Sequence, residues 1–356
     1  MEVTRRQIIK AGAGLPLSMV LGSPFAKAAD LKAVKLGVGL KSMSPIVINL
    51  VIGEALGFHK EEGFTLTTMA LGSNANVQVA VDKGDVDFGV GVPSLGLKML
   101  AEGKWTECTN FYEYTYPYKW DVAVSPDSQI KSYEDLKGKS VGVSSFGGTE
   151  FPVTKNVLKL LGIDSEVDVK WVAVGGGVPA GVALQRGQID ALAYYDTGFG
   201  QVEAAGIPFR MLNRPANLPL IGGQFLEMRK DRLKSERALA VGLGRSVAKS
   251  SQFILENPLA GAKAFLKMYP ETAPKGATQE EAQKAIVKAI SRRIRIYTPP
   301  YSGAAMGSIN EKEFRTEAEM NKLAITDFKP FYTNDLIEDI NRFDKDAIKA
   351  MAKNYS

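Results

Sequence analysis

The chain has 356 residues, of which 45% are hydrophobic and 23% charged, with a net charge of +5 and a mean hydropathy of −0.07. This composition excludes a disordered chain, a collagen, a coiled coil and a polytopic membrane protein, and the length predicts about two domains. A single cysteine, Cys108, excludes an internal disulfide framework and a thiolate-rich metal cluster. A single histidine, His59, argues against most metal sites and against a histidine-based catalytic triad.

The amino-terminal segment has the pattern of an export signal. Arg5-Arg6 precedes a mildly apolar stretch over 11–25, and Ala26-Lys27-Ala28 matches a small-x-small cleavage site. The apolar stretch is too short for a membrane span, so residues 1–28 are predicted to be a twin-arginine (Tat) signal peptide that is removed near Ala28. Without these residues, four basic and one acidic, the net charge falls from +5 to +2. That balance does not support nucleic acid or an anionic membrane as the partner.

Short β-rich runs alternate with helical runs in two successive sets. The first set has predicted strands at 34–39, 65–70 and 86–90, and helices at 46–56, 76–83 and 94–102. The second set has predicted strands at 141–144, 169–174 and 191–195, and helices at 151–161, 180–186 and 202–205. This alternation predicts an α/β fold of two lobes, each a mostly parallel sheet flanked by helices.

An aromatic, strand-like run over 111–124 separates the two sets, and the chain from Asp231 onward is predicted to be helical, with prolines as punctuation. We expect this all-helical C-terminal segment to pack on the first lobe. The chain then crosses between lobes at about 118–120 and again at about 220–224. Lobe 1 is therefore predicted to comprise 30–119 and 225–356, and lobe 2 to comprise 120–224, with a hinge and a ligand cleft between them.

The loops after the predicted strands are the candidate binding elements, because ligands of open α/β sheets bind at the carboxyl ends of strands. These loops are small, hydroxylated and glycine-rich, and backbone N–H groups at helix starts suit a carboxylate or a sulfonate. Ordinary helix capping is the alternative explanation for each loop taken alone. The loops are 41–44, 72–74, 91–94, 145–150, 175–177 and 195–197.

Four tyrosines alternate in the aromatic run, so Tyr112, Tyr114, Tyr116 and Tyr118 are predicted to share one face of a strand. Tyr116 and Trp120 flank the predicted hinge, and we expect their rings to stack on a planar ligand. Core packing is the alternative for every tyrosine of this run.

Other residues with chemical potential have simpler interpretations. The run 175–180 matches the dinucleotide fingerprint G-x-G-x-x-A, with Asp196 at the end of the next strand, but its helix is short and no hydride-transfer partner accompanies it. His59 is interpreted as a solvated surface histidine, and Cys108 as a buried, inert thiol. The basic run 292–295 is interpreted as the solvated side of an amphipathic helix over 285–297.

Several stretches carry a resemblance to a known family. They are GEALGF at 53–58, EGF at 62–64, AVDKGDVDFG at 80–89, SYEDLKGKSVGV at 132–143 and ALQRGQIDA at 183–191. Together they resemble the substrate-binding proteins of ABC importers, in the group that handles nitrate, sulfonates, taurine and thiamine-pyrimidine precursors. The likeness spans about residues 34–230, and the helical tail agrees with the family in character only.

This resemblance implies a type II periplasmic-binding fold, in which two α/β lobes close on a ligand and deliver it to a membrane permease. The family's ligand loops correspond to Ser42, Met43, Ser44, Asn74, Pro93, Ser94, Ser145, Phe146, Gly147, Gly148, Thr149, Glu150, Tyr195 and Asp196. Eukaryotic relatives that form pyrimidines consume an active-site histidine and need a cysteine cluster, and this sequence lacks that set. Glu150 and Asp196 would repel a fully charged anion, and no arginine stands out in these loops.

We therefore expect a monomeric, periplasmic, non-enzymatic component of an ABC importer, with no cofactor and no metal. Its expected partners are a small-molecule ligand, the permease with its ATPase, and the Tat export machinery, and not nucleic acid. Tyr116, Trp120, Phe146 and Tyr195 favour a planar ligand, either an aromatic carboxylate or a pyrimidine. A sulfonate or taurine, a dinucleotide-dependent enzyme using 175–180, and an extracytoplasmic sensor module remain the alternatives.

Overall fold

The computed structural model describes residues 30–104, 107–117, 119–215, 218 and 221–356. The predicted Tat signal peptide, with its cleavage site near Ala28, lies outside the described residues, and so do Tyr118 and Leu220 of the predicted crossings. Leu31–Ser356 form one compact unit, which is described below. Within the described part of the chain, every helix is too short or too polar to cross a membrane.

The first sheet has five strands in the order β2-β1-β3-β10-β4. These strands are β1 (Lys32–Val38), β2 (Phe64–Ala70), β3 (Phe88–Gly91), β4 (Cys108–Thr115) and β10 (Gln224–Arg229). Strand β1 pairs in parallel with β2 and β3, whereas β10 pairs antiparallel with both β3 and β4. Strands β1, β2, β3 and β4 therefore run in the same direction, as the prediction of a mostly parallel sheet requires. The sheet is mixed because β10, which follows the second set of elements, inserts antiparallel between β3 and β4.

The second sheet has five strands in the order β7-β6-β8-β5-β9. These strands are β5 (Trp120–Val124), β6 (Ser140–Val143), β7 (Lys170–Ala173), β8 (Ala191–Tyr195) and β9 (Arg210–Met211). Strand β6 pairs in parallel with β7 and β8, and β5 pairs antiparallel with β8 and β9. This sheet is also mixed, and the predicted alternation of strands and helices is confirmed in both sheets.

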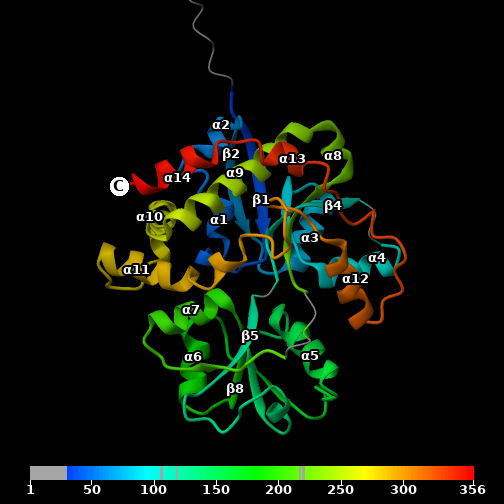
Figure 1. Cartoon of the computed structure of the whole chain (residues 1–356), viewed down its shortest axis with the longest axis vertical. Helices are drawn as coiled ribbons and strands as arrows, with labels where there is room; N and C mark the ends of the chain where they lie inside the picture. The colour runs from blue at the N-terminus through cyan, green and yellow to red at the C-terminus, as the bar shows by residue number, and fades with distance from the viewer. Residues whose placement is uncertain (1–29, 105–106, 118, 216–217, 219–220) are drawn as a thin grey trace, which may run out of the picture. The chain divides into compact units, whose positions relative to one another are not determined.

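Helices connect and cover the strands (Figure 1). The helices of the first strand–helix set are η1 (Pro45–Val47), α1 (Ile48–Val51), α2 (Phe58–Glu61), α3 (Asn74–Lys83) and α4 (Pro93–Ala101). Those of the second set are η2 (Glu134–Leu136), α5 (Glu150–Leu160), α6 (Val178–Gln185) and α7 (Asp196–Ala204). Those after β10 are α8 (Lys230–Ser235), α9 (Arg237–Glu256), α10 (Pro258–Met268), η3 (Pro270–Thr272), α11 (Gln279–Ile290), η4 (Arg293–Ile296), α12 (Glu311–Met320), α13 (Ile337–Ile340) and α14 (Lys345–Lys353).

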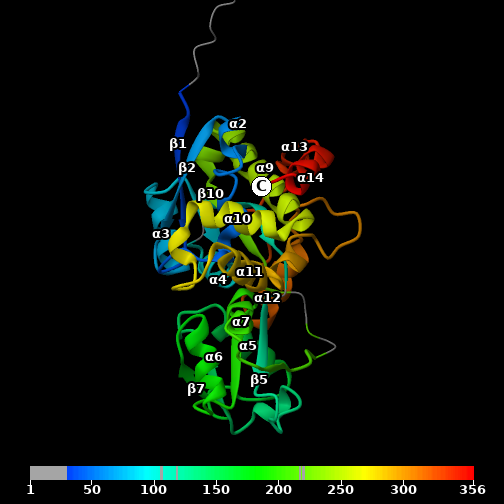
Figure 2. The same ribbon diagram turned by 90° about the vertical axis from the view of Figure 1, so that its left-hand side faces the viewer.

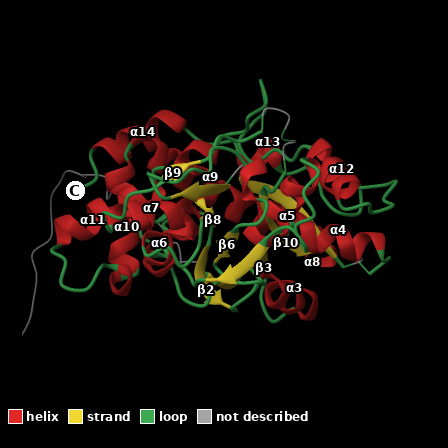
Figure 3. Ribbon diagram, turned by 90° about the horizontal axis from the view of Figure 1, so that it is seen from below, coloured by secondary structure: helices red, strands yellow, loops and turns green. Residues whose placement is uncertain are grey.

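The second sheet buries both faces, as the period-two alternation of strand side chains requires. Val122 and Val124 join a core cluster with Val157 of α5, whereas Ala123 between them joins a different cluster with Leu184 of α6. Helix α5 therefore covers one face of this sheet, and α6 and α7 cover the other (Figure 3). The loops at the carboxyl ends of β6, β7 and β8 all lead into these helices.

The C-terminal helices pack on the first sheet. Leu36 and Phe88 share a core cluster with Leu243 of α9 and Phe265 of α10, and Phe314 of α12 packs in the cluster on the opposite face. Figure 2 shows these helices around the first sheet, with α11 directly above α7 of the second. The all-helical segment predicted from the sequence is thus confirmed, although a strand, β10, precedes it.

Close approaches fix how the two halves of the compact unit meet. Gly200 of α7 faces the α11 backbone, and a Cβ there would lie 2.5 Å from Ala289 Cα. A Cβ at Gly222, whose φ is +88°, would overlap the Trp120 ring. Glycine is required at both places, at Gly200 for helix approach and at Gly222 for both space and backbone conformation.

The prediction for His59 is wrong, because the side chain is fully buried. Its Nδ1 lies 3.0 Å from Glu54 Oε2, and its ring stacks on Phe64 with centroids 5.1 Å apart. The sequence around it, Gly57 to Gly63, is charged because α2 presents only one face inward. His59 belongs to the core of the first sheet.

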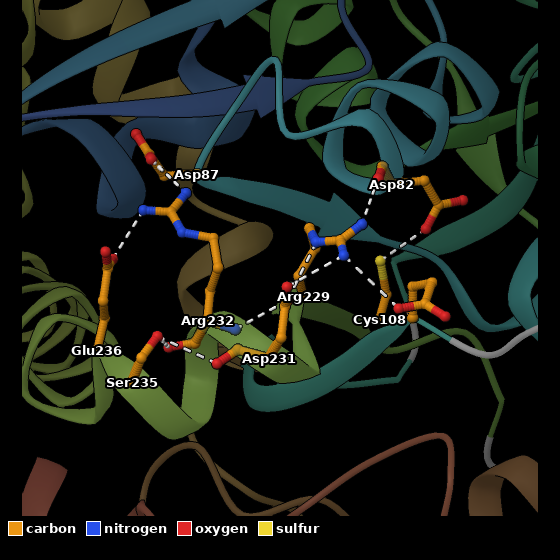
Figure 4. Close-up of polar contacts among 9 residues, drawn as sticks. Asp82, Asp87, Cys108, Arg229, Asp231, Arg232, Ser235 and Glu236 are labelled. Carbon is orange, nitrogen blue, oxygen red and sulfur yellow. Dashed lines mark hydrogen bonds and ion pairs between the residues drawn. The ribbon is translucent and has the colours of Figure 1, made fainter.

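The prediction of a buried, inert thiol is confirmed for Cys108. Its Sγ donates to Asp82 Oδ1 at 2.9 Å, beside Arg229, whose Nη1 donates to the Asp82 carbonyl oxygen at 2.6 Å (Figure 4). Burial, Glu227 and Asp82 all raise the pKa of the Cys108 thiol far above its ordinary value. A protonated, buried thiol is a poor nucleophile.

Candidate functional site

A cavity of about 830 Å³ lies between the loops of the two sheets and is lined on one side by the C-terminal segment. This volume is in the range of sites for small organic ligands. Eleven of the predicted site residues line it: Ser42, Met43, Ser44, Asn74, Trp120, Ser145, Gly147, Gly148, Thr149, Glu150 and Tyr195. The cavity therefore brings together loops that are about 150 residues apart in the chain.

The wall from the first sheet is built by the loops after β1 and β2. Ser73 caps α3 by accepting a hydrogen bond from the Asn76 backbone at 3.2 Å. Asn74, the first residue of α3, lies so close to Gly39 that a Cβ at Gly39 would lie 2.8 Å from the Asn74 backbone nitrogen. The loop 72–74 therefore both caps α3 and lines the cavity.

The wall from the second sheet is built around the amino terminus of α5. Glu150, the first residue of α5, is buried, and its Oε1 accepts from the Ser144 backbone at 2.9 Å and from the Ser144 hydroxyl. A carboxylate at a helix amino terminus is stabilised by the helix dipole. Glu150 therefore holds the loop 144–150 in place, and this use was not predicted.

The loop 175–177, which matches the dinucleotide fingerprint, also lines the cavity. The Gly177 backbone nitrogen donates to the Tyr194 hydroxyl, which in turn donates to the Gly175 carbonyl oxygen at 3.3 Å. Gly177 has φ +68° and leads into α6, which has eight residues. The backbone N–H of Gly177, at the start of α6, is therefore already used in a hydrogen bond within the protein.

Asp196 lies outside the cavity lining and forms a buried ion pair with Arg293. Nε and Nη2 of Arg293 lie 2.7 and 2.6 Å from the two carboxylate oxygens, and Nη1 donates to the Ile46 carbonyl oxygen at 3.3 Å. The pair joins α7 of the second sheet to η4 of the tail. The interpretation of run 292–295 as a solvated face is therefore wrong for Arg293, whose side chain is fully buried.

The neighbouring arginines differ in environment. Arg292 pairs with Glu203 of α7 at 2.8 Å, and Arg295 is exposed. A signal for Arg293 is present in the sequence, because Ile286, Ile290, Arg293 and Tyr297 recur at spacings of four, three and four, the inner face of a helix. The spacing places Arg293 with the apolar residues and not with its basic neighbours.

Four other predicted site residues lie outside the cavity lining. The Tyr116 ring is buried, and its hydroxyl accepts from the Gly307 backbone at 2.8 Å and donates to the Ser308 carbonyl oxygen at 3.3 Å. Pro93 is buried at the start of α4 and Ser94 follows it. Phe146 is 57% exposed, and its ring packs against that of Phe151 with centroids 5.4 Å apart.

Lys119 is a cavity-lining residue that sequence reasoning missed. Only 3% of the residue is exposed, and its Nζ lies 4.7 Å from the centroid of the Trp120 ring. Burial lowers the pKa of the Lys119 amine well below its ordinary value and nearby Arg293 lowers it further, whereas Asp196 and Glu150 act in the opposite direction. The sequence signal that could have identified Lys119 is its position as a lysine inside the aromatic, strand-like run 111–124.

Further cavity-lining residues were not predicted from the sequence. Tyr114 of β4 donates through its hydroxyl to Gln224 Oε1 of β10 at 2.7 Å, and both side chains line the cavity. The C-terminal segment contributes Thr272, Pro274, Ala285, Ile286 and Ala289. Reasoning from the loops after the predicted strands does not reach these residues, because Tyr114 and Gln224 belong to strands β4 and β10 and the others to the C-terminal segment.

Three buried glutamates lie beside the return crossing of the chain. A Cβ at Gly223 would lie 3.0 Å from the Glu113 carboxyl carbon and 3.2 Å from Glu313 Oε2. Burial raises the pKa of Glu317 to about 8 and that of Glu313 to about 7, and burial beside Glu313 raises the pKa of Glu113 well above its ordinary value. Within the described residues, no group of three or more His, Cys, Asp or Glu side chains is arranged to hold a metal ion.

Comparison with known proteins gives a family match and a set of similar folds. The family described as NMT1/THI5 like matches residues 44–260. A structure from Bordetella bronchiseptica is 22% identical, with a TM-score of 0.65, over 88% of this chain and 98% of that one. The periplasmic aliphatic sulphonate-binding protein SsuA of Escherichia coli is 16% identical, with a TM-score of 0.61, over 90% and 99%.

Two further matches differ in extent. The ligand-binding component of an ABC-type import system from Staphylococcus aureus, with zinc bound, is 12% identical, with a TM-score of 0.60, over 88% of this chain and 100% of that one. The ATP phosphoribosyltransferase of Thermodesulfovibrio yellowstonii is 44% identical over 57 residues, which are 16% of this chain and 18% of that enzyme. The structural matches show the type II periplasmic-binding-protein fold, whereas the match to the enzyme covers a short segment.

Proposed function

The chain belongs to the NMT1/THI5-like family, and from that premise we propose that it is the extracytoplasmic solute-binding component of an ABC importer. It binds a small organic ligand in the cavity between the two sheets and presents it to a membrane permease. The single observation that carries this proposal is the 830 Å³ cavity lined by loops of both sheets. A ligand that contacts both walls stabilises the closed arrangement of the lobes over the open one.

The proposed lobes are 30–119 with 225–356, and 120–224, in a periplasmic protein from which residues 1–28 have been removed. The proposed ligand is planar, an aromatic carboxylate or a pyrimidine, because Trp120 and Tyr195 line the cavity. A sulfonate is the second candidate, since the SsuA relative is described as a sulphonate-binding protein. The protein binds its ligand without transforming it, unlike the enzyme to which it is similar over 57 residues.

The experiment is a set of thermal melting curves of the purified protein with benzoate, nicotinate, cytosine, uracil, taurine, ethanesulfonate and NADH. A ligand at about 100 times its Kd adds about 2.7 kcal/mol to the free energy of unfolding. We expect an aromatic acid or a pyrimidine to raise the melting temperature. A shift with taurine or ethanesulfonate alone would replace the aromatic ligand by a sulfonate, and a shift with NADH alone would contradict a transport role.

A matched pair of variants places the ligand. Ser145 is exposed and lines the cavity, whereas the side chain of its neighbour Phe146 lies outside it. Ser145→Trp is expected to fill the cavity and abolish the ligand-induced shift, and Phe146→Trp is expected to leave it unchanged. Equal effects of the two substitutions would show that the ligand does not occupy this cavity.

A further inference from the structure

Lys119 places an amine side chain in the wall of the cavity, at the crossing from the first sheet to the second. The residue is 3% exposed and lines the cavity, and its backbone carbonyl accepts from the Asp196 backbone at 2.7 Å. That backbone bond anchors Lys119 at the carboxyl end of β8. The backbone of Lys119 is therefore held by the second sheet, and its Nζ lies 4.7 Å from the centroid of the Trp120 ring.

Among the described residues, no hydrogen-bond acceptor and no carboxylate pairs with Lys119 Nζ, and its contact is the face of the Trp120 ring. Lys249, the other buried lysine of the described chain, is different. Its Nζ lies 2.8 Å from Glu61 and 3.6 Å from Glu62. Buried amines are normally paired in this way, because an unpaired one is costly to desolvate.

The nearby acidic residues are already bonded to other groups. Both carboxylate oxygens of Asp196 accept from Arg293, and Glu150 accepts from Ser144. The charged groups that act on the Lys119 amine are therefore the Asp196–Arg293 ion pair and the Glu150 carboxylate, and each already has hydrogen-bond partners. A partner for the Lys119 amine would therefore approach from the cavity, which Lys119 lines.

We propose that Lys119 is the residue that binds an anionic group of the ligand, so the solute is an organic acid, carrying a carboxylate or a sulfonate. This inference rests on the proposed function and narrows it, because it excludes the neutral pyrimidines. The Asp196–Arg293 pair removes the repulsion that Asp196 would otherwise exert on an anion. The Trp120 ring lies beside the amine and offers an apolar face to the body of the acid.

The first test needs no ligand. An unpaired buried amine destabilises the empty protein, so Lys119→Met is expected to raise its melting temperature by a few degrees. Lys249→Met, which breaks a paired buried lysine, is expected to lower it. A fall in melting temperature with Lys119→Met would show that the amine stabilises the fold through its own neighbours, and would overturn the proposal.

The second test uses matched compounds that differ in charge: benzoate with benzamide, nicotinate with nicotinamide, and ethanesulfonate with ethanesulfonamide, together with cytosine and uracil. We expect the acids to bind and their amides not to. A charge-assisted hydrogen bond predicts that Lys119→Met weakens acid binding about 10- to 100-fold, whereas Lys119→Arg retains most of it.

The outcomes separate this inference from the proposed function. Binding of neutral compounds alone, or equal affinity of Lys119→Met and wild type for an acid, overturns the anion proposal and leaves the solute-binding role intact. Failure of every compound to bind, with no small molecule released when the purified protein is denatured, counts against both. Binding of acids that depends on Lys119 supports both.

Discussion

Replacing Asp196 by asparagine removes one charge of the buried ion pair that joins α7 to η4. The Arg293 side chain is fully buried and the Asp196 side chain is 6% exposed. The substitution retains the shape but leaves the guanidinium charge with neutral acceptors alone, the amide oxygen at position 196 and the Ile46 carbonyl oxygen at 3.3 Å. Breaking one partner of such a pair costs about 3 to 5 kcal/mol, because the remaining charge stays buried and uncompensated.

Urea unfolding followed by circular dichroism measures this cost. With an m-value of about 3 kcal/mol per molar, as expected at the upper end for single domains, a loss of this size lowers the unfolding midpoint by about 1 to 1.7 M. Arg295→Met is the control, since Arg295 is exposed in the same segment, and its effect is expected to stay within about 0.5 kcal/mol.

The double variant Asp196→Asn with Arg293→Met completes the cycle. It removes both charges, so its loss of stability is expected to be smaller than the sum of the two single losses. A loss below about 1 kcal/mol for Asp196→Asn, or strict additivity in the double variant, would refute the reasoning that the pair is buried and coupled.

Two further predictions concern packing and pH. Gly200→Ala places a Cβ 2.5 Å from Ala289 Cα and is expected to lower the free energy of unfolding in urea by about 1 to 3 kcal/mol. Gly147→Ala is the control and is expected to be neutral, because the space around Gly147 is open. Equal effects of the two substitutions would contradict the close contact between α7 and α11. Glu317, with a pKa raised to about 8, stays protonated in the folded chain while the unfolded chain ionises near its ordinary 4.5, so this residue makes stability fall by about 1.4 kcal/mol per pH unit between those values. Glu317→Gln is expected to flatten the decline of melting temperature from pH 5 to 8, and an unchanged decline would show that Glu317 is ionised in the folded protein.

Strands and helices whose side chains follow a simple period were predictable. Strand β8 has the predicted bounds. Strand β1 differs from prediction by two residues at its start and one at its end, whereas β2 and α3 end as predicted and begin one and two residues earlier. Strand β10 was not predicted, because Gln224 and Glu227 interrupt its apolar residues. Both side chains are buried, since β10 lies between β3 and β4 with neighbours on each side.

Helix α7 shows the same division between local signal and tertiary contact. It begins at Asp196, six residues before the predicted start, although Gly198 and Gly200 lower its helix propensity. Both glycines are required by contact: a Cβ at Gly198 would lie 2.6 Å from Tyr194 Cδ1, and Gly200 faces α11. Packing thus overrides local propensity here.

The sequence by itself determined the two α/β sets, the glycine-rich loops and the family resemblance, because strand period, turn residues and short motifs are local properties. Tertiary structure alone decided that Arg293 neutralises Asp196, that the tail lines the cavity and that Lys119 lines it without an acceptor for its amine among the described residues. Those outcomes depend on desolvation and on pairing between residues about 100 positions apart, and no local pattern encodes which charges meet when water is excluded.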